Sequence, residues 1–276
     1  MIDTVVYYHS NCPDGFGSAW AFYKKYGDKA KYIPYRYGDA ISNYNNKDIF
    51  FLDCSCERDV LLKIKKEAKS VNVIDHHITA LKKLHDLDFC HIDMNNSGCV
   101  LSWKYLFPEQ EVPLILQYVE DRDLWKWNLK HSKEVLSYID TFDRTIEIWS
   151  NLDLELNCKD EKSSDYGFQK IVRSGRDIMR YKNSVSKKIS KNIEKIKLCG
   201  YNGVMVNSPF LQGEIADELT KYDLILIYYK VGGIYKCSLR TSKDYVDVSK
   251  VAEKFNGGGH KKASGFITSN LNGIIE

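Results

Sequence analysis

The sequence predicts an α/β protein in which a parallel-sheet domain is followed by a smaller α+β domain with a mixed sheet. Three short apolar runs, 4–8, 48–52 and 71–74, are separated by segments of helical character. Strands that alternate with helices are typical of a parallel sheet with right-handed crossovers. A length of 276 residues also favours two domains, since an ordinary domain has about 150 residues.

The first strand, 4–8, ends at His9 and is followed by a turn that contains Asp14. Pro13 and two glycines permit a tight backbone path into a helix over 19–26, whose amino terminus favours a nearby anion. Residues 31–37 alternate as a strand, and Pro34 places that strand at an edge of the sheet.

The second and third apolar runs end at Asp53 and at Asp75-His76-His77, with an amphipathic helix over 57–68 between them. A short strand is expected within 87–93. Residues 95–98 offer caps for a helix with an apolar stripe from Val100 to Leu106. Pro113 opens a further helix, 114–120, which leads to Asp121-Arg122-Asp123 and two tryptophans. That charged triplet is either a solvated helix end or part of a metal site.

Residues 151–165 are polar, and a long basic helix is expected from Tyr166 to about Ile196. Beyond it, strands are expected at 203–206, 224–229 and 234–240, with helices at 214–220 and 248–255. We therefore expect three parts: a catalytic metal-binding domain at 1–165, a connector helix at 166–198 and a substrate-binding domain at 199–276.

The composition is that of a globular protein, with 43% hydrophobic and 28% charged residues and no apolar run long enough to span a membrane. The amino terminus has no secretory signal, so we expect a cytoplasmic protein with reduced thiols. Cys54 and Cys56 with Cys12 could belong to a zinc site, but no second Cys-x-x-Cys pair completes it. A net charge of +3 does not suit a protein that coats long nucleic acid.

Polar side chains at the ends of three predicted strands point to metal chemistry. The carboxyl ends of parallel strands share one edge of a sheet, where ligands of open α/β sheets bind. Carboxylates with imidazoles suit Mn, Mg, Fe or Zn, and a carboxylate-rich set suits two ions that share a bridging carboxylate. Each strand end taken alone could be polar simply because the sheet ends there. The candidate residues are His9, Asp14, Asp53, Asp75, His76 and His77.

Near the carboxyl end, Gly257-Gly258-Gly259-His260 is followed by two lysines. Consecutive glycines let backbone N–H groups approach an anion, and Arg240, at the end of a predicted strand, could fork onto a phosphate. A flexible loop is the alternative interpretation of the glycines.

Asp75-His76-His77 after a strand, together with Gly257-Gly258-Gly259-His260, resembles the DHH phosphoesterase superfamily with its DHH-associated second domain. The resemblance covers nearly the whole chain and implies a two-manganese site. It implies that Asp53 bridges the ions, that His77 faces the scissile phosphate and that Asp75 orients an imidazole. The remaining metal ligands that it implies are His9, Asp14, His76 and Asp121, and the implied nucleotide-binding residues are Arg240, Gly258, Gly259 and His260.

One position departs from the family pattern. Members usually carry a second aspartate two positions before the one that matches Asp14, and this chain has Cys12 there. A thiol is a softer ligand than a carboxylate, so Cys12 could be a weaker or differently selective metal ligand, and Asn11 could compensate.

The resemblance implies a manganese-dependent phosphohydrolase of the nanoRNase or cyclic-dinucleotide phosphodiesterase type, which acts on small nucleotides or short oligonucleotides. Mg²⁺ or another divalent ion is an alternative cofactor. Two alternative functions stay open: a nucleotide-binding sensor with a degenerate metal site, and an exonuclease on longer single strands. The sequence leaves open the exact substrate, the cleavage direction and whether the chain forms a homodimer.

Overall fold

The computed structural model describes residues 3–42, 44–158, 167–271 and 274, and it divides the chain into two compact units, Met1–Arg176 and Asp177–Glu276. The long basic helix is α8 (Phe168–Ile189), which starts in the first unit and ends in the second. The expected start of this helix at Tyr166 lies outside the described residues. The proposed boundaries at 165 and 198 stay a prediction.

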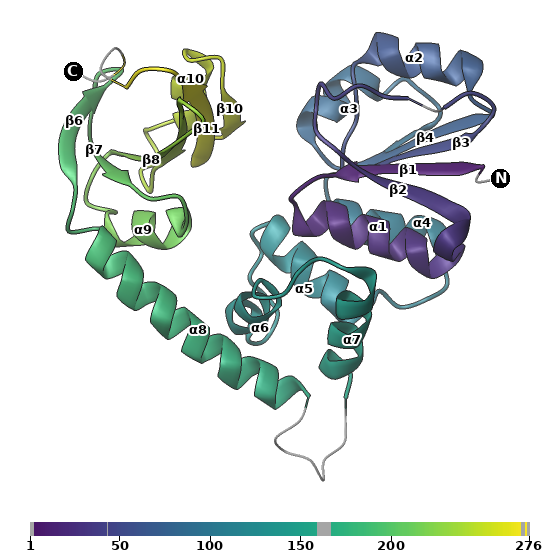
Figure 1. Cartoon of the computed structure of the whole chain (residues 1–276), viewed down its shortest axis with the longest axis horizontal. Helices are drawn as coiled ribbons and strands as arrows, with labels where there is room; N and C mark the ends of the chain where they lie inside the picture. Colours follow the sequence, from purple (N-terminus) through teal and green to yellow (C-terminus); the bar gives the residue numbers. More distant parts are fainter. Residues whose placement is uncertain (1–2, 43, 159–166, 272–273, 275–276) are drawn as a thin grey trace. The chain divides into compact units, whose positions relative to one another are not determined.

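The first unit contains a five-stranded sheet in which every strand pair is parallel, which confirms the predicted fold class. The order is β2-β1-β3-β4-β5, with β2 at one edge, as Pro34 indicated. Apolar, β-branched runs form these strands because both faces of the sheet are covered by helices (Figure 1). Their bounds are β1 (Thr4–His9), β2 (Ala30–Tyr35), β3 (Asp48–Leu52), β4 (Ser70–Asp75) and β5 (Cys90–Ile92).

Alternate strand residues feed two separate cores. On one face, side chains such as Val5 and Phe51 pack with α2 (Arg58–Glu67) and α3 (Ile78–Leu84). On the other face, Val6 and Phe50 pack with α1 (Pro13–Tyr26) and α4 (Gly98–Leu106). A short 3₁₀ helix (Gly27–Lys29) joins α1 to β2.

Three further helices pack on the layer that α1 and α4 form: α5 (Leu114–Asp123), α6 (Ser132–Ile139) and α7 (Ile146–Leu156) (Figure 1). Neither α6 nor α7 was predicted, and α7 extends into the stretch from 151 that was expected to be only polar. Trp149, Leu152 and Leu156 are buried at helical spacing in α7. A helical reading of that period would have found the helix.

The second unit contains a mixed six-stranded sheet with the order β10-β11-β9-β8-β7-β6, in which only β7 and β8 are parallel. This confirms the predicted α+β character. The expected strands and helices are present as β7 (Tyr201–Asn207), α9 (Gln212–Glu218), β8 (Leu224–Val231), β9 (Ile234–Arg240) and α10 (Val248–Glu253).

Two differences from prediction concern short strands in this unit. The predicted helix ends at Ile189, and β6 (Glu194–Leu198) follows it. Cys199 and Gly200 both have positive φ, as a tight two-residue hairpin turn to β7 requires. The glycine stretch is the hairpin of β10 (Gly258–His260) with β11 (Ala263–Thr268), not a flexible loop. No helix in the described ranges is long and apolar enough to cross a bilayer.

Candidate active site

The candidate active site lies at the carboxyl ends of β1, β3 and β4. His9 is the last residue of β1, Asp53 follows β3, and Asp75 ends β4 directly before His76 and His77. From β1 the chain first adds β2 on one side and then returns to add β3 on the other side. A crevice forms at the carboxyl ends of two neighbouring strands whose connections leave in opposite directions, here β1 and β3. The predicted convergence of the three strand ends is therefore present.

Close backbone approaches shape this crevice. Asp53 has φ +55, an uncommon conformation for a residue with a side chain and one that concentrates at functional sites. A Cβ on Gly15 would come within 2.2 Å of the His9 carbonyl oxygen, so only glycine lets α1 begin against the end of β1. A Cβ on Gly98 would lie 2.6 Å from Cβ of Asp53. Two glycines thus bring α1 and α4 against the strand ends.

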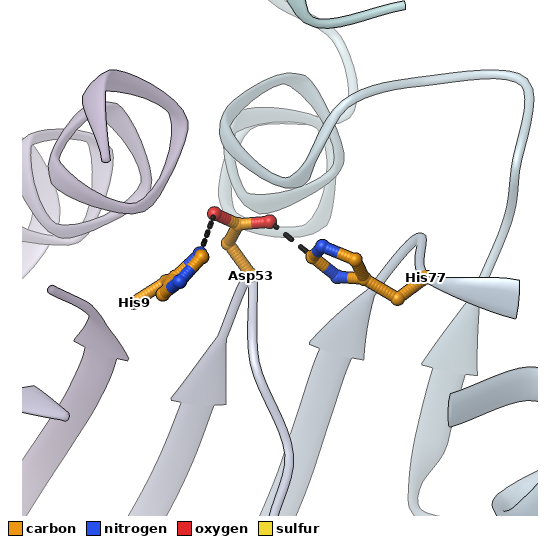
Figure 2. A group of neighbouring side chains, drawn as sticks. All are labelled: His9, Asp53 and His77. Atoms are coloured by element: carbon orange, nitrogen blue, oxygen red, sulfur yellow. Dashed lines mark hydrogen bonds and ion pairs between the residues drawn. The ribbon is translucent and has the colours of Figure 1, made fainter. Parts of the chain in front are cut away.

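The first ligand cluster consists of His9, Asp53 and His77, whose donor atoms lie within 4.8 Å of one another. Asp53 stands between the two imidazoles (Figure 2). Its Oδ2 is 3.2 Å from Nδ1 of His9, and its Oδ1 is 3.9 Å from Nδ1 of His77. The hydrogen bond to Asp53 raises the pKa of His9.

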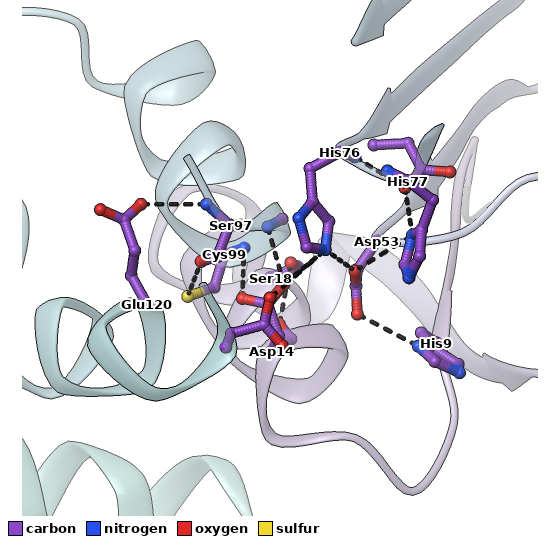
Figure 3. Close-up of polar contacts among 12 residues, drawn as sticks. His9, Asp14, Ser18, Asp53, His76, His77, Ser97, Cys99 and Glu120 are labelled. Carbon is purple, nitrogen blue, oxygen red and sulfur yellow. Dashed lines mark hydrogen bonds and ion pairs between the residues drawn. The ribbon is translucent and has the colours of Figure 1, made fainter. Parts of the chain in front are cut away.

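The second ligand cluster consists of Asp14, His76 and Asp123. Nε2 of His76 lies 3.6 Å from Oδ2 of Asp14 and 3.5 Å from Oδ2 of Asp123. The same nitrogen lies 3.2 Å from Oδ1 of Asp53, so Asp53 faces both clusters (Figure 3). This is the position that a bridging carboxylate would need.

Asp14 is buried, and its carboxylate accepts hydrogen bonds from the backbone N–H groups of Gly98 and Cys99, at 2.7 and 2.9 Å. These groups open α4, so the anion that a helix amino terminus favours is here a carboxylate of the chain itself. Burial raises the pKa of Asp14 to about 8, and the charges of Asp53 and Asp123 act in the same direction.

The pKa of Asp53 is lowered, whereas that of Asp14 is raised, because Asp53 has two histidine partners. Burial by itself would raise the pKa of this carboxyl, but the interactions with His76 and His9 outweigh it and hold the pKa at about 2. Burial likewise opposes the charged form of His76, yet Asp53 and the neighbouring acids raise its pKa to about 9. The crevice therefore concentrates carboxylates around imidazoles.

The donor set fits divalent cations. Oδ1 of Asp53 is buried and accepts no aligned hydrogen bond from any described residue, although Nε2 of His76 is within ion-pair distance. An unsatisfied carboxylate oxygen is costly unless a cation or donor meets it. Each cluster joins imidazole to carboxylate oxygen, a combination that suits Mn, Fe or Zn more than an all-oxygen site would.

His77 is oriented by Asp75. Oδ1 of Asp75 accepts hydrogen bonds from the backbone N–H groups of His76 and His77, and it lies 2.7 Å from Nδ1 of the His77 ring. This hydrogen bond is the main reason that the pKa of His77 is raised. Since Nδ1 is engaged, Nε2 is the ring atom left to meet a substrate.

Asp121 does not join either cluster, and the structure places Asp123 beside His76 instead. The oxygens of Asp121 accept hydrogen bonds from the backbone N–H groups of Asn128 and Leu129, at 2.7 and 3.2 Å. Arg122, between the two acids, pairs with Asp140 at 2.8 Å. The triplet thus reaches the second ligand cluster through Asp123, two positions after the predicted Asp121, and its role as a metal ligand stays a prediction. Burial is the main reason that the pKa of Asp123 is raised.

Cys12 also stays outside both clusters in the part of the chain that the structure describes. It is the residue before α1, its backbone is extended, and its side chain makes no capping hydrogen bond. Burial, with the charges of Asp53 and Asp14, raises the pKa of the Cys12 thiol. The thiol is half-buried beside the crevice, and its role as a metal ligand stays a prediction.

In the second unit, Arg240 ends β9 opposite Ala263 of β11. Its guanidinium donates to the Leu239 carbonyl oxygen at 2.9 Å, and it pairs with no carboxylate among the described residues. It lines a cavity of about 620 Å³ together with Lys236 and Asn256. Burial lowers the pKa of Arg240, as expected for a cation without a counter-ion.

The glycines of this unit differ in their surroundings. A Cβ on Gly257 or Gly259 would meet the backbone of β11 at 2.2 or 2.7 Å, whereas a Cβ on Gly258 would meet nothing within 4 Å. Gly258 and His260 are exposed and do not line the cavity at Arg240. Gly257 and Gly259 thus have structural reasons to be glycine, and the described part of the unit shows none for Gly258.

Several known proteins are similar to this chain in sequence or in fold. The DHHA1 domain family matches residues 212–276. The chain is 30% identical to the uncharacterized protein R106 of Acanthamoeba polyphaga mimivirus over an alignment of 305 positions, gaps included, which covers 98% of this chain and 69% of that protein. It is 27% identical over 211 residues to oligoribonuclease NrnB of Bacillus subtilis, and this match covers 71% of this chain and 52% of NrnB.

The pGpG-specific phosphodiesterase PggH of Vibrio cholerae has a similar fold, with a TM-score of 0.54 at 12% identity over 98% of this chain and 95% of that one. The Asp-His-His strand end, the two ligand clusters and the matched carboxyl-terminal domain occur in one chain in the expected order. The chain therefore belongs to the DHH phosphoesterase superfamily, with a DHHA1 domain at its carboxyl end.

Proposed function

We propose that the protein is a divalent-metal phosphodiesterase that hydrolyses short oligonucleotides or small nucleotides, with manganese as its ion. The observation that supports this most directly is that Asp53, a member of the first ligand cluster, also lies 3.2 Å from His76 of the second. Among its relatives, NrnB is an oligoribonuclease and PggH a pGpG-specific phosphodiesterase, so both act on small nucleic-acid substrates.

The residues of the first unit have separable roles in this proposal. Asp53 would hold both ions, with His9 on one side and Asp14, His76 and Asp123 on the other. Two divalent ions, when bound, lower the pKa of a water and offset negative charge on a phosphate. Asp75 keeps the His77 ring in one orientation, so that Nε2 can donate a proton or a hydrogen bond to a phosphate oxygen.

The second unit would hold the substrate. Arg240 is half-buried without a carboxylate partner, so an anion that enters its cavity meets an uncompensated guanidinium. The cavity volume of about 620 Å³ lies within the range of small-molecule sites. With a net charge of +3 over the whole chain, the protein suits a short substrate better than a long strand.

The test is a panel of dinucleotides, a cyclic dinucleotide and graded oligonucleotides, incubated with manganese or magnesium and mapped for products. Turnover should require the ion and be fastest on the shortest substrates. Asp53→Asn should reduce both turnover and metal binding by more than the ~10- to 100-fold expected for loss of an outer-shell partner. Asp59→Asn, an exposed acid on α2, is the matched control and should match the unmutated protein.

Two results would contradict the proposal. Undiminished turnover after removal of all divalent ions would exclude metal-assisted hydrolysis. Tight binding of a dinucleotide with no turnover under any ion would favour the nucleotide sensor instead.

A further inference from the structure

A second feature of the first unit is a cavity of about 420 Å³ that adjoins the ligand clusters. His9, Asp53 and His77 line one side, and Tyr37 and Lys83, which take no part in either cluster, also line it. Tyr37 follows β2 and Lys83 is in α3, so segments far apart in the sequence meet at this cavity.

Tyr37 is exposed over 62% of its surface although it lines the cavity at the ligand clusters. Its hydroxyl donates to Oε1 of Glu57 and accepts from Nζ of Lys83 at 3.3 Å. The lysine nitrogen is 5.7 Å from the ring centroid, much farther than from the hydroxyl, so it lies at the rim of the ring. Two charged residues thus hold the ring by its hydroxyl and leave its faces free.

The two charged partners of Tyr37 line different cavities, although they pair with each other at 3.5 Å. Lys83 lines the cavity at the ligand clusters, and Glu57 lines a neighbouring cavity of about 310 Å³. Tyr37 and Cys56 line both cavities. On the side of the metal ligands, the ring is accompanied by the Lys83 cation and by the hydroxyl groups of Ser55 and Thr79, besides the carboxylates of Asp53 and Asp75.

We propose that Tyr37 and Lys83 form a nucleoside subsite in the first unit, in which the ring stacks on the base of the nucleotide whose phosphate lies at the ligand clusters. This inference rests on the proposed function, because it assigns the base to the nucleotide that would be cleaved. A flat, exposed ring stacks on any base, so the subsite tolerates different sequences. A pre-oriented ring loses little conformational entropy on binding. Lys83 would contact a phosphate on the same nucleotide.

The experiment measures binding of two ligands to the full chain in the presence of manganese, by isothermal titration. Adenosine 5′-monophosphate carries the base, and ribose 5-phosphate does not. The unmutated protein should bind the nucleotide roughly 5- to 150-fold more tightly, the range for one stacked base. Tyr37→Ala should bring this ratio close to one, and Tyr37→Phe should keep it within about threefold. Lys83→Gln should weaken both ligands by the same factor.

Tyr181→Ala, at an exposed tyrosine of α8, is the control and should keep the ratio of the unmutated protein. Circular dichroism confirms that each variant is folded. A ratio of one in the unmutated protein, or an unchanged ratio in Tyr37→Ala, would overturn the subsite. A protein that shows the Tyr37-dependent ratio but hydrolyses nothing in the substrate panel would retain the subsite and refute the proposed hydrolysis.

Discussion

Gly98→Ala adds a single methyl group where α4 meets the two ligand clusters. The new Cβ would lie 2.6 Å from Cβ of Asp53, 3.0 Å from its Cα and 3.0 Å from Oδ2 of Asp14. Ordinary carbon contacts are 3.5–4.0 Å, so the first overlap is about 1 Å. Asp53 cannot retreat easily, because its backbone has φ +55 and its N–H donates to the Ile74 carbonyl oxygen at 2.9 Å.

The expected cost follows from this geometry. Overpacking of a closely packed site destabilises a protein by about 1–3 kcal/mol. With a urea dependence of about 2 kcal/mol per molar, the unfolding midpoint should fall by roughly 0.5–1.5 M. Relief of the overlap must also move Asp53 or Asp14, whose oxygens belong to different clusters. Manganese binding should therefore weaken by about tenfold, which corresponds to about 1.4 kcal/mol.

Tryptophan fluorescence reports the unfolding of the first unit, because all five tryptophans lie in it. Circular dichroism follows both units, and calorimetric titration gives the manganese affinity. Gly213→Ala is the matched control, since Gly213 is also near the start of a helix and its added Cβ would meet nothing within 4 Å. That variant should unfold within about 0.5 kcal/mol of the unmutated protein or be slightly more stable.

An unchanged midpoint together with unchanged manganese affinity in Gly98→Ala would refute this reasoning. It would show that α4 can move away from Asp53 without cost, and that the close approach does not position the ligand clusters. A lower midpoint with full manganese affinity would confine the role of Gly98 to packing.

Three other predictions test the roles of candidate metal ligands and candidate substrate-binding residues. Asp123→Asn should weaken manganese binding without a large loss of stability. Asp121→Asn should destabilise the first unit by about 1–3 kcal/mol, because its single amide oxygen can accept only one of the two backbone N–H groups that Asp121 accepts and the other would face an NH2 group. Equal metal loss in both variants would contradict the assignment. Cys12→Asp should tighten manganese binding, since a carboxylate suits a hard cation better than a thiol does, and a calorimetric titration with unchanged affinity and stoichiometry would leave Cys12 a packing residue. Arg240→Lys should reduce kcat/KM on a short oligonucleotide by roughly tenfold or more while metal content stays the same. His260→Ala should have a smaller effect because the His260 ring is exposed. Loss of manganese in either variant would contradict a substrate-binding role.

The local patterns in the sequence were sufficient to predict the strands and their chemistry. Apolar runs of five or six residues that stop at His9, Asp53 and Asp75 are strands because β-branched and aromatic residues suit a sheet buried on both faces. Parallel strands necessarily bring their carboxyl ends to one edge, so the meeting of these side chains followed from topology alone. The second domain was predictable in the same way, except for β6, whose alternation is hidden in a charged run, and for the hairpin of β10 and β11, whose glycines do not favour a strand.

Tertiary structure decided which neighbours complete the site. Asp121 and Asp123 are two positions apart in α5, so they lie on different faces of the helix. The packing of α5 turns Asp121 toward the backbone N–H groups of Asn128 and Leu129 and brings Asp123 beside His76. Tyr37 reaches the cavity beside His77 across a separation of 40 residues, because β2 and α3 flank that end of the sheet. A sequence period reports the face on which a side chain lies, whereas contacts between distant segments depend on the crossovers and on the closeness of packing.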